Sequence, residues 1–236
     1  MLNARYSGIV NNTHQFVFHI LGCGAIGSSA AVQICRMGGD NFYLYDYDQV
    51  ESVNIGVSQF NHSDIGKNKV DALKEHLLNI NPNVQVTTIH AMFNDYRYQG
   101  EKDIAILGFD SMKSRLEAVM CLCKYKDAKP QYIIDGRMGA EHYQQYIIDG
   151  RMGAEHYQQY IIDKPTVTKY KEYWYSDEEG STEPCNAKAT SYCSNMSGSF
   201  IANSVRKLIM GQPYNRKFSF NFPIMLLEKT PLISKL

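Results

Sequence analysis

The sequence carries no excess of charge and no long apolar run, and each absence excludes a class of protein. Its 236 residues include 24 basic and 24 acidic side chains, which give a formal net charge of zero. A neutral balance argues against a general nucleic-acid or membrane-surface binder, because phosphate groups attract a basic surplus. No apolar run approaches the roughly 18 residues that span a bilayer. The first residues lack the apolar core of an export signal, and we therefore expect a cytoplasmic protein.

Paired cysteines are also missing. The six cysteines stand at positions 23, 35, 121, 123, 185 and 193, and no two have the Cys-x-x-Cys spacing of a zinc ribbon. We predict that most of them are reduced thiols that pack as small apolar groups. Cys185 is the exception, because it lies after a polar loop and just before a predicted helix.

The amino-terminal residues predict a strand, a glycine turn, a helix and a second strand. An apolar run at 16–21 ends in Gly22-Cys-Gly-Ala-Ile-Gly27. Small and apolar residues then recur at helical spacing over 25–37, and a second apolar run at 41–45 ends in Asp46. Such glycines let a phosphate approach the amino terminus of a helix, and an acid after the second strand can bind ribose hydroxyls. This unit leaves a dinucleotide oxidoreductase and an ATP-using enzyme equally open.

Strand and helix patterns continue to alternate along the chain. Spacing and apolar runs predict helices over 67–79 and 111–125 and strands over 84–89 and 103–107. Further on they predict an aromatic strand over 167–175, an acidic surface loop over 176–183, a buried helix over 187–210 and an edge strand over 218–222. We expect a single α/β domain over 1–236. Its sheet should be Rossmann-like and mostly parallel, with helices on both faces and antiparallel strands added in the carboxyl-terminal half.

A 14-residue unit is repeated inside this domain. Residues 131–144 recur letter for letter at 145–158, and their first five residues recur again at 159–163. A solenoid needs several diverged units and end caps, so a recent tandem duplication is the better explanation. We expect the extra residues in an added hairpin or a bulged loop that leaves the sheet intact. Because the copies are identical, Arg137 and Arg151 are equivalent candidates for any arginine role.

An ordered set of polar residues follows the glycine turn. It comprises Asp46, Asp48, Asn54, Gln59, Lys69 and Asp110, with Arg115 five residues after the last of them. In this order and spacing the set resembles the ubiquitin-activating-enzyme-like superfamily, the ThiF, MoeB and HesA adenylyltransferases, over about 16–211. The later part is similar, more narrowly, to short standalone bacterial and phage ThiF-domain proteins. That similarity lies in Ile-Asp-Gly-Arg-Met-Gly at 134–139, Asp-Glu-Glu at 177–179 and Pro184-Cys185.

The resemblance implies ATP and Mg²⁺ as ligands and gives each residue a role. Nucleotide binding falls to Gly22, Gly24, Gly27, Asp46, Asp48, Asn54, Gln59 and Lys69, with Asp46 on the ribose and Asn54 and Lys69 on phosphates. Asp110 would bind Mg²⁺, a hard cation that takes carboxylate and phosphate oxygens. Lys69 and Asp110 are the predicted catalytic groups. The plain alternatives are a solvated helix lysine for Lys69, a helix cap for Asp110 and a solvated loop acid for Asp48.

The implied reaction joins a carboxylate to the α-phosphate of ATP and releases pyrophosphate. The carboxylate is typically the carboxyl-terminal glycine of a ubiquitin-like or sulfur-carrier protein, and the resemblance also implies a homodimer. Cys185 stands where some relatives place a nucleophilic cysteine that accepts the acyl group, and Lys188 nearby would favour its thiolate. An ordinary cysteine near the chain crossover is the alternative.

The sequence departs from the family at three places. Family members carry an arginine just before the glutamine of the loop that holds the asparagine, and this chain has none there. A second arginine usually follows the amino-terminal Arg-Tyr, where this chain has Gly8. The family's zinc-binding cysteine pairs are absent, so we predict no structural zinc. Because such arginines stabilise transition-state charge, either Arg5, Arg36 or Lys67 substitutes, or turnover is weak, or the chain binds nucleotide without activating a carboxylate.

Three functions therefore stay open. An ATP-dependent adenylyltransferase uses every residue of the set, and a nucleotide-binding scaffold or partner subunit with little catalysis is the alternative that the missing arginines favour. A nicotinamide-dependent oxidoreductase is supported by the glycine turn and Asp46 alone. It has no use for Lys69 and Asp110 as groups that bind phosphate and magnesium.

Overall fold

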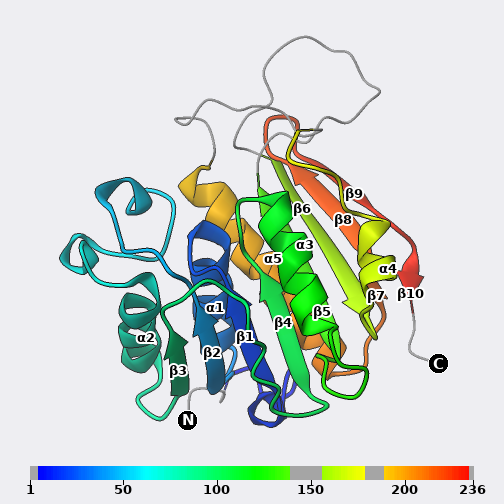
Figure 1. Ribbon diagram of the computed structural model, residues 1–236, viewed down its shortest axis with the longest axis horizontal. Helices are drawn as coiled ribbons and strands as arrows, with labels where there is room; N and C mark the ends of the chain where they lie inside the picture. Colours follow the sequence, from blue (N-terminus) through cyan, green and yellow to red (C-terminus); the bar gives the residue numbers. More distant parts are fainter. Residues whose placement is uncertain (1–4, 139–155, 179–188, 234–236) are drawn as a thin grey trace.

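An eight-stranded sheet forms the centre of the molecule. The computed structural model describes residues 5–138, 156–178 and 189–233. The strands lie in the order β3-β2-β1-β4-β5-β6-β8-β9 (Figure 1). Their bounds are β1 Val17–Leu21, β2 Asn41–Tyr45, β3 Gln85–Ile89, β4 Asp103–Leu107, β5 Tyr132–Met138, β6 His156–Asp163, β8 Lys217–Asn221 and β9 Leu226–Lys229. Two short strands, β7 Tyr214–Asn215 and β10 Leu232–Ile233, pair separately with each other.

The amino-terminal half of the sheet is parallel, as the alternation of strands and helices predicts. β1 lies between β2 and β4, with Ile20 opposite Leu44 on one side and opposite Ile106 on the other. β3 and β5 extend the sheet in the same direction. Every residue of β4 is buried, which is typical of a parallel strand that has helices on both faces.

The carboxyl-terminal half of the sheet is antiparallel, and this prediction is also confirmed. β6 pairs with β5 and β8, and β9 is the last strand on that side. The expected edge strand over 218–222 is wrong, because β8 lies between β6 and β9. Its alternation reflects one half-exposed face, whereas the true edge is β9, whose four residues are all exposed and which no sequence pattern predicted.

Helices cover both faces of the sheet, and each face has its own apolar core. One face carries α1 Ala25–Arg36, α2 Lys69–Ile80 and α5 Ser191–Ile209, and the other carries α3 Met112–Leu122 and α4 Val167–Lys171 (Figure 1). Short 3-10 turns span Thr13–Gln15, Ser52–Asn54 and His62–Asp64. Ile34, Leu73 and Val205 lie in the first core, and Val119 and Tyr170 lie in the second. Within the described ranges no helix is both long and apolar enough to cross a bilayer.

Two helices differ from their predictions. α4 lies where we predicted an aromatic strand over 167–175. The hydroxyl of Thr166 accepts from the N–H of Lys169 and caps this helix, and Val167, Tyr170 and Trp174 recur at helical spacing against the second core. Aromatic residues favour strands in general, but here their spacing decides the structure. α5 starts at Ser191 rather than at 187, and residues 187 and 188 lie outside the described ranges.

The repeated unit supplies two neighbouring strands. β5 lies in the first copy, and β6 joins the end of the second copy to the third partial copy. The pairing between them runs without interruption from Tyr132 and Asp163 to Met138 and Tyr157. The sheet is therefore intact, as expected. The predicted added hairpin or bulged loop falls on 139–155, outside the described residues.

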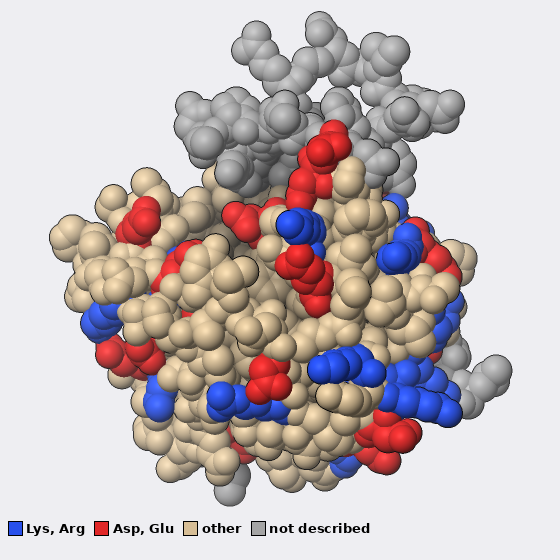
Figure 2. All heavy atoms as spheres, in the orientation of Figure 1, with Lys and Arg blue, Asp and Glu red and all other residues tan. Residues whose placement is uncertain are grey.

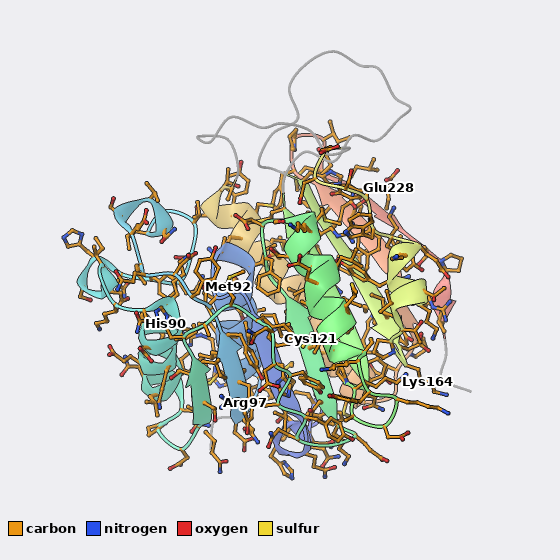
Figure 3. All side chains as sticks on the ribbon, viewed as in Figure 1. His90, Met92, Arg97, Cys121, Lys164 and Glu228 are labelled. Carbon is orange, nitrogen blue, oxygen red and sulfur yellow. The ribbon has the colours of Figure 1, made fainter. Side chains whose placement is uncertain are left out.

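The chain crosses from β3 to β4 without a helix. Figure 3 shows His90, Met92 and Arg97 along this connection, on the side of the sheet that carries α3. The hydroxyl of Tyr96 donates to Asp103 (2.7 Å), and Asp103 also lies 3.1 Å from Nε2 of the buried His19. A buried polar contact therefore holds the irregular connection against β1 and β4.

Candidate functional site

The predicted site residues gather where β1, β2 and β4 end. The ladder continues one residue past the strands, since the N–H of Gly22 donates to the carbonyl of Tyr45 and the N–H of Gly108 donates to that of Leu21, both at 2.8 Å. The turns that follow the three strands are therefore neighbours. In open α/β sheets ligands bind outside the carboxyl ends of the strands, and this is the upper edge of the sheet in Figure 1.

The three glycines of the turn after β1 have three different surroundings. Gly22 has φ +88°, and a Cβ there would lie 2.9 Å from the carbonyl carbon of Gly108. A Cβ on Gly27 would lie 1.8 Å from the backbone oxygen of Gly22, so this glycine lets α1 pack against the turn. Gly24 has no atom of the described chain within 4 Å of an added Cβ. Its side of the turn, at the amino end of α1, is therefore open for a ligand.

Asp46 follows β2 and holds the loop to the glycine turn. Its carboxylate accepts from the N–H of Cys23 at 2.7 Å and from the N–H of Asp48 at 2.9 Å. Burial raises the pKa of Asp46, and these two N–H groups offset only part of that effect. Carboxylate oxygens can accept further hydrogen bonds, so the side chain can still receive a ribose hydroxyl.

Lys69 and Asp48 form an ion pair beside Asp46. Nζ of Lys69 lies 2.6 Å from the Asp48 carboxylate, and the Lys69 side chain is 11% exposed against 45% for Asp48. Burial alone lowers the pKa of Lys69, but the hydrogen bond to Asp48 and the charge of Asp46 outweigh it, and the pKa is raised. Asp46, Asp48 and Lys69 are called the loop cluster below. The solvated-lysine alternative is wrong, because the Lys69 side chain is mostly buried and points to these two acids.

Asn54 and Gln59 lie in the same loop but are bonded to the protein. Asn54 accepts from the N–H of Glu51 and closes a 3-10 turn. The amide of Gln59 donates to Asn195 of α5 at 2.7 Å, and its N–H donates to Ser28 of α1 at 3.2 Å. Both residues fix the loop against the helices, and their predicted contacts with a nucleotide stay a prediction.

Asp110 lies in the turn between β4 and α3 and is exposed. Within the described part of the chain its carboxylate makes no hydrogen bond or ion pair. The alternative of a helix cap is wrong, since Ser111 is the N-cap of α3 and accepts from the N–H of Ser114. Among the described residues no three His, Cys, Asp or Glu side chains gather as a ready metal cage. A cation here would therefore depend on Asp110 and on ligands brought by a nucleotide.

A second charged group lies behind Asp110 and was not among the predicted site residues. Arg115 of α3 and Arg137 of β5 both bind the fully buried carboxylate of Asp135, and these three are called the arginine cluster below. Arg137 lies 2.7 Å from that carboxylate, and the Tyr170 hydroxyl donates to it at 3.0 Å. Burial alone raises the pKa of Asp135, but the charges of Arg137 and Arg115 outweigh it, and the pKa is lowered.

Asp177 belongs to the Asp-Glu-Glu segment that carries the family resemblance, but it was not among the predicted site residues. We predicted it in a solvated acidic loop, but its carboxylate accepts from the Ser111 hydroxyl (3.0 Å) and from the N–H groups of Met112 (2.6 Å) and Lys113 (3.0 Å). Figure 2 shows acidic and basic side chains close together over the upper part of α3. No local pattern distinguishes this acid from its neighbours, because its partners lie more than sixty residues away.

Arg36 and Lys67 are two of the proposed substitutes for the missing arginines. Arg36 ends α1, about 17 Å along the helix from its start at 1.5 Å per residue. Nζ of Lys67 lies 2.5 Å from Glu75 and 3.3 Å from Asp64. Lys67 is therefore paired with two acids, and a role for Arg5, Arg36 or Lys67 in place of the missing arginines stays a prediction. Cys185 lies outside the described residues.

Comparison with known proteins gives a family-wide match. A model of the ThiF family matches residues 11–233. Ubiquitin-like modifier-activating enzyme 5 of Dictyostelium discoideum is 36% identical over 113 residues, which are 47% of this chain and 27% of that protein. The same enzyme of Arabidopsis thaliana is 40% identical over 80 residues, 33% of this chain and 19% of that protein. The chain thus spans only a minor part of these relatives.

Solved structures share the fold. E. coli MccB in a structure with ATP has a TM-score of 0.66 at 18% identity, covering 94% of this chain and 64% of MccB. PaaA has a TM-score of 0.65 at 20% identity, covering 95% of this chain and 66% of its own. Identities at this level support the α/β architecture described above and leave the chemistry to be argued from the residues.

Proposed function

The chain belongs to the ThiF family, and from that premise we propose that it binds ATP with Mg²⁺ and adenylates a carboxylate. One observation carries the proposal: the open glycine turn, the loop cluster and the exposed Asp110 all lie at the same edge of the sheet. A Cβ on Gly24 would meet no described atom within 4 Å, the buried Lys69 pairs with Asp48 beside the Asp46 that binds the turn, and the Asp110 carboxylate has no hydrogen-bond or ion-pair partner in the described chain.

The residues at this edge fit a nucleotide with a divalent cation. The free space at Gly24 lies at the amino end of α1, where N–H groups and the helix dipole attract phosphate. Asp46 is a hydrogen-bond acceptor suited to the ribose, and Lys69 can exchange Asp48 for a phosphate oxygen. Mg²⁺ prefers carboxylate and phosphate oxygens, and Asp110 can supply the first. Bound there, the ion would neutralise charge on the phosphates.

The chain's own residues would act mainly by position and charge. In adenylation a carboxylate oxygen attacks the α-phosphorus, the bond to the β-phosphate breaks, and pyrophosphate leaves. This reaction needs no covalent group from the protein, so holding the reactants in line and cancelling phosphate charge supply the rate. Lys69 would hold phosphate oxygens, and Asp46 would fix the ribose.

A ubiquitin-like or sulfur-carrier protein is the proposed source of the carboxylate. Relatives with 36% and 40% identity over part of the chain are ubiquitin-like modifier-activating enzymes, and an E. coli MccB structure carries ATP. A later transfer to Cys185 and assembly as a homodimer belong to the same proposal.

A nucleotide-binding scaffold or partner subunit is the second candidate. It is favoured by one observation: Arg36 lies at the far end of α1 from the glycine turn and Lys67 is paired with Glu75 and Asp64, so neither side chain is held at the turn by a contact of the described chain. ATP binding without pyrophosphate exchange, with the carboxylate partner supplied, would identify this second function.

Pyrophosphate exchange into ATP tests the proposal. Wild type should exchange in the presence of Mg²⁺ and a carboxylate partner, and Asp110→Ala should lower the rate by roughly a hundred-fold or more, because one charge-stabilising group is lost. Asp127→Ala is the matched control, since Asp127 is also an exposed acid and lies in the turns that follow the other end of α3. An Asp110→Ala protein that exchanges like Asp127→Ala contradicts the proposed role.

A further inference from the structure

The turn that carries Asp110 is held by residues that do not touch its carboxylate. Asp110 makes no side-chain hydrogen bond or ion pair with the described chain, so the direction of its carboxylate depends mainly on the backbone from Gly108 to Ser111. The residues that hold this backbone come from α3, from β5 and from the segment after α4.

Arg115 holds the turn from the inside. Its guanidinium donates to the carbonyl of Phe109 and, at 3.5 Å, to that of Leu107. The backbone N–H of Arg115 donates to the backbone carbonyl of Ser111 at 3.1 Å. A guanidinium is a rigid, planar group with five donors. Arg115 therefore spans the residues on both sides of the turn and limits their movement relative to each other.

Asp135 and Arg137 hold Arg115 in turn. Asp135 shares its carboxylate between the two arginines, and Nε of Arg137 donates to it at 2.9 Å. Arg137 is fixed further by a hydrogen bond to the carbonyl of Tyr173 (2.9 Å) and by the ring of Tyr160, 4.3 Å from its guanidinium carbon. The arginine cluster is thus buried, and a rotation of Arg115 would break its bonds to Asp135 and to the carbonyl of Phe109.

Asp177 holds the same turn from the outside. It binds the Ser111 hydroxyl and the N–H groups of Met112 and Lys113, as described above, and the indole of Trp174 donates to the carbonyl of Met112 at 2.8 Å. Burial alone raises the pKa of Asp177, but the N–H groups of Met112 and Lys113 outweigh it, and the pKa is lowered. An ionised carboxylate therefore fixes the first turn of α3, next to Asp110.

From this arrangement we infer that Arg115 and Asp177 are positioning residues for Asp110. They fix the turn from its two sides, so the Asp110 carboxylate is presented in one direction without a hydrogen-bond or ion-pair partner among residues 5–138, 156–178 and 189–233. Mg²⁺ requires near-ideal octahedral geometry at about 2.0–2.1 Å, which makes its binding sensitive to a small displacement of the turn. The inference rests on the proposed function, because it assumes that Asp110 meets a cation held with a nucleotide.

The test compares Asp177→Asn and Arg115→Lys with wild type by titrating Mg²⁺ in the presence of ATP. Asp177→Asn keeps the shape of the side chain and loses one acceptor charge, and Arg115→Lys keeps the charge and loses the fork. We expect the Mg²⁺ concentration for half-maximal ATP binding to rise about ten-fold or more, the cost typical of residues behind a metal ligand. ATP affinity measured with a chelator should stay within about two-fold of wild type in both variants. A merely structural role would lower both affinities together.

Asp163→Asn is the control for Asp177→Asn. Asp163 is a partly exposed acid that pairs with Arg216 and lies on β6, away from the turn. Hydrogen exchange without nucleotide gives a second readout: amides of Met112 and Lys113 should exchange faster in Asp177→Asn than in Asp163→Asn. Because Asp177 lies near the surface, this variant keeps the test valid if Arg115→Lys fails to fold.

The outcomes separate the two proposals. Wild type whose ATP binding does not respond to Mg²⁺ contradicts the proposed function, and the positioning role with it. If Mg²⁺ strengthens ATP binding by wild type, and both variants need the same Mg²⁺ concentration as wild type, only the positioning role is contradicted. A raised Mg²⁺ requirement with unchanged chelated ATP affinity supports it.

Discussion

The loop cluster and the arginine cluster lie on the same edge of the sheet and differ in what surrounds them. In the loop cluster the Asp48 side chain is 45% exposed and its partner Lys69 11%, and the Gly24 side of the neighbouring turn is open. In the arginine cluster the side chains of Arg115, Asp135 and Arg137 are 4%, 0% and 5% exposed. Exposed charges can exchange their partner for a ligand, whereas buried charges stabilise one arrangement of the chain. The loop cluster therefore suits binding, and the arginine cluster suits positioning.

The largest expected effect comes from removing the shared carboxylate of the arginine cluster. Asp135→Asn, made together with Asp149→Asn because the copies are identical, leaves two arginines buried without their acid. The free energy of unfolding should fall by about 3–5 kcal/mol, measured by urea unfolding. Asp48→Asn in the loop cluster should cost less, about 1 kcal/mol, because the Asp48 side chain is 45% exposed and Asp46 stays beside Lys69.

Asp149→Asn alone is the matched control, because the described cluster contains Asp135. It should leave the free energy of unfolding within about 0.5 kcal/mol of wild type. A loss equal to that of the double variant would mean that the second copy can supply the buried acid.

The glycine turn offers a second contrast within a few residues. Gly27→Ala would bring a methyl group 1.8 Å from the backbone oxygen of Gly22, so we expect the free energy of unfolding to fall by about 1–3 kcal/mol. Gly24→Ala meets no atom within 4 Å, but φ −73° and ψ −148° lie outside the regions that alanine favours, so backbone strain alone should lower stability by about 1 kcal/mol. Its ATP affinity should also fall about ten-fold, or roughly 1.4 kcal/mol.

Thermal or urea unfolding and ATP calorimetry on both variants measure this contrast. Unchanged ATP affinity in Gly24→Ala would contradict the proposal that the nucleotide binds on this side of the turn.

Deleting one copy of the repeat tests how far the insertion affects the sheet. Removing 145–158 shortens the connection between β5 and β6 from 17 residues, 139–155, to three and leaves every paired residue type in place. The entropy of closing a shorter loop predicts a gain of about 1.5 kcal/mol in the free energy of unfolding. A loss of stability, or altered ATP binding, would show that the sheet depends on the inserted unit.

The smallest expected effect is a difference between the pH at which ATP binding weakens and the pH at which the chain unfolds. The pKa of Asp135 is lowered from 3.8 and that of Asp46 is raised from it. Stability from Asp135 is therefore complete above its unfolded pKa and is lost as the pH falls through the lower folded value. The pKa of Asp46 is shifted in the opposite direction, because folding disfavours its charged form. Asp46 is therefore protonated at a higher pH than Asp135, and its protonation costs no stability.

Acid should therefore weaken ATP binding before it unfolds the chain, since protonated Asp46 has fewer lone pairs for hydrogen-bond donors. ATP affinity and near-UV circular dichroism, followed on the same samples, measure the two transitions. Coincidence of the two at one pH would contradict the assignment of Asp46.

The same contrast explains which parts of the molecule the sequence predicts. The βαβ unit and the residues after its strands follow from local spacing, so Gly22, Asp46, Lys69 and Asp110 were found in advance and do lie at one edge. The arginine cluster and Asp177 depend on contacts between residues far apart in the chain, such as Asp177 with Met112. Strand β9 and helix α4 were missed for different reasons: no local pattern marks the exposed β9, whereas the aromatic residues of 167–175 were interpreted as a strand although their spacing is helical.

The most direct test of the account is ATP binding measured with Mg²⁺ and with a chelator, alongside NADH, for wild type and Asp110→Ala. The account predicts that wild type binds ATP more tightly with Mg²⁺, that Asp110→Ala loses this difference while it stays folded, and that NADH binds more weakly than ATP. NADH binding in preference to ATP, or ATP binding that ignores both Mg²⁺ and Asp110, would contradict it.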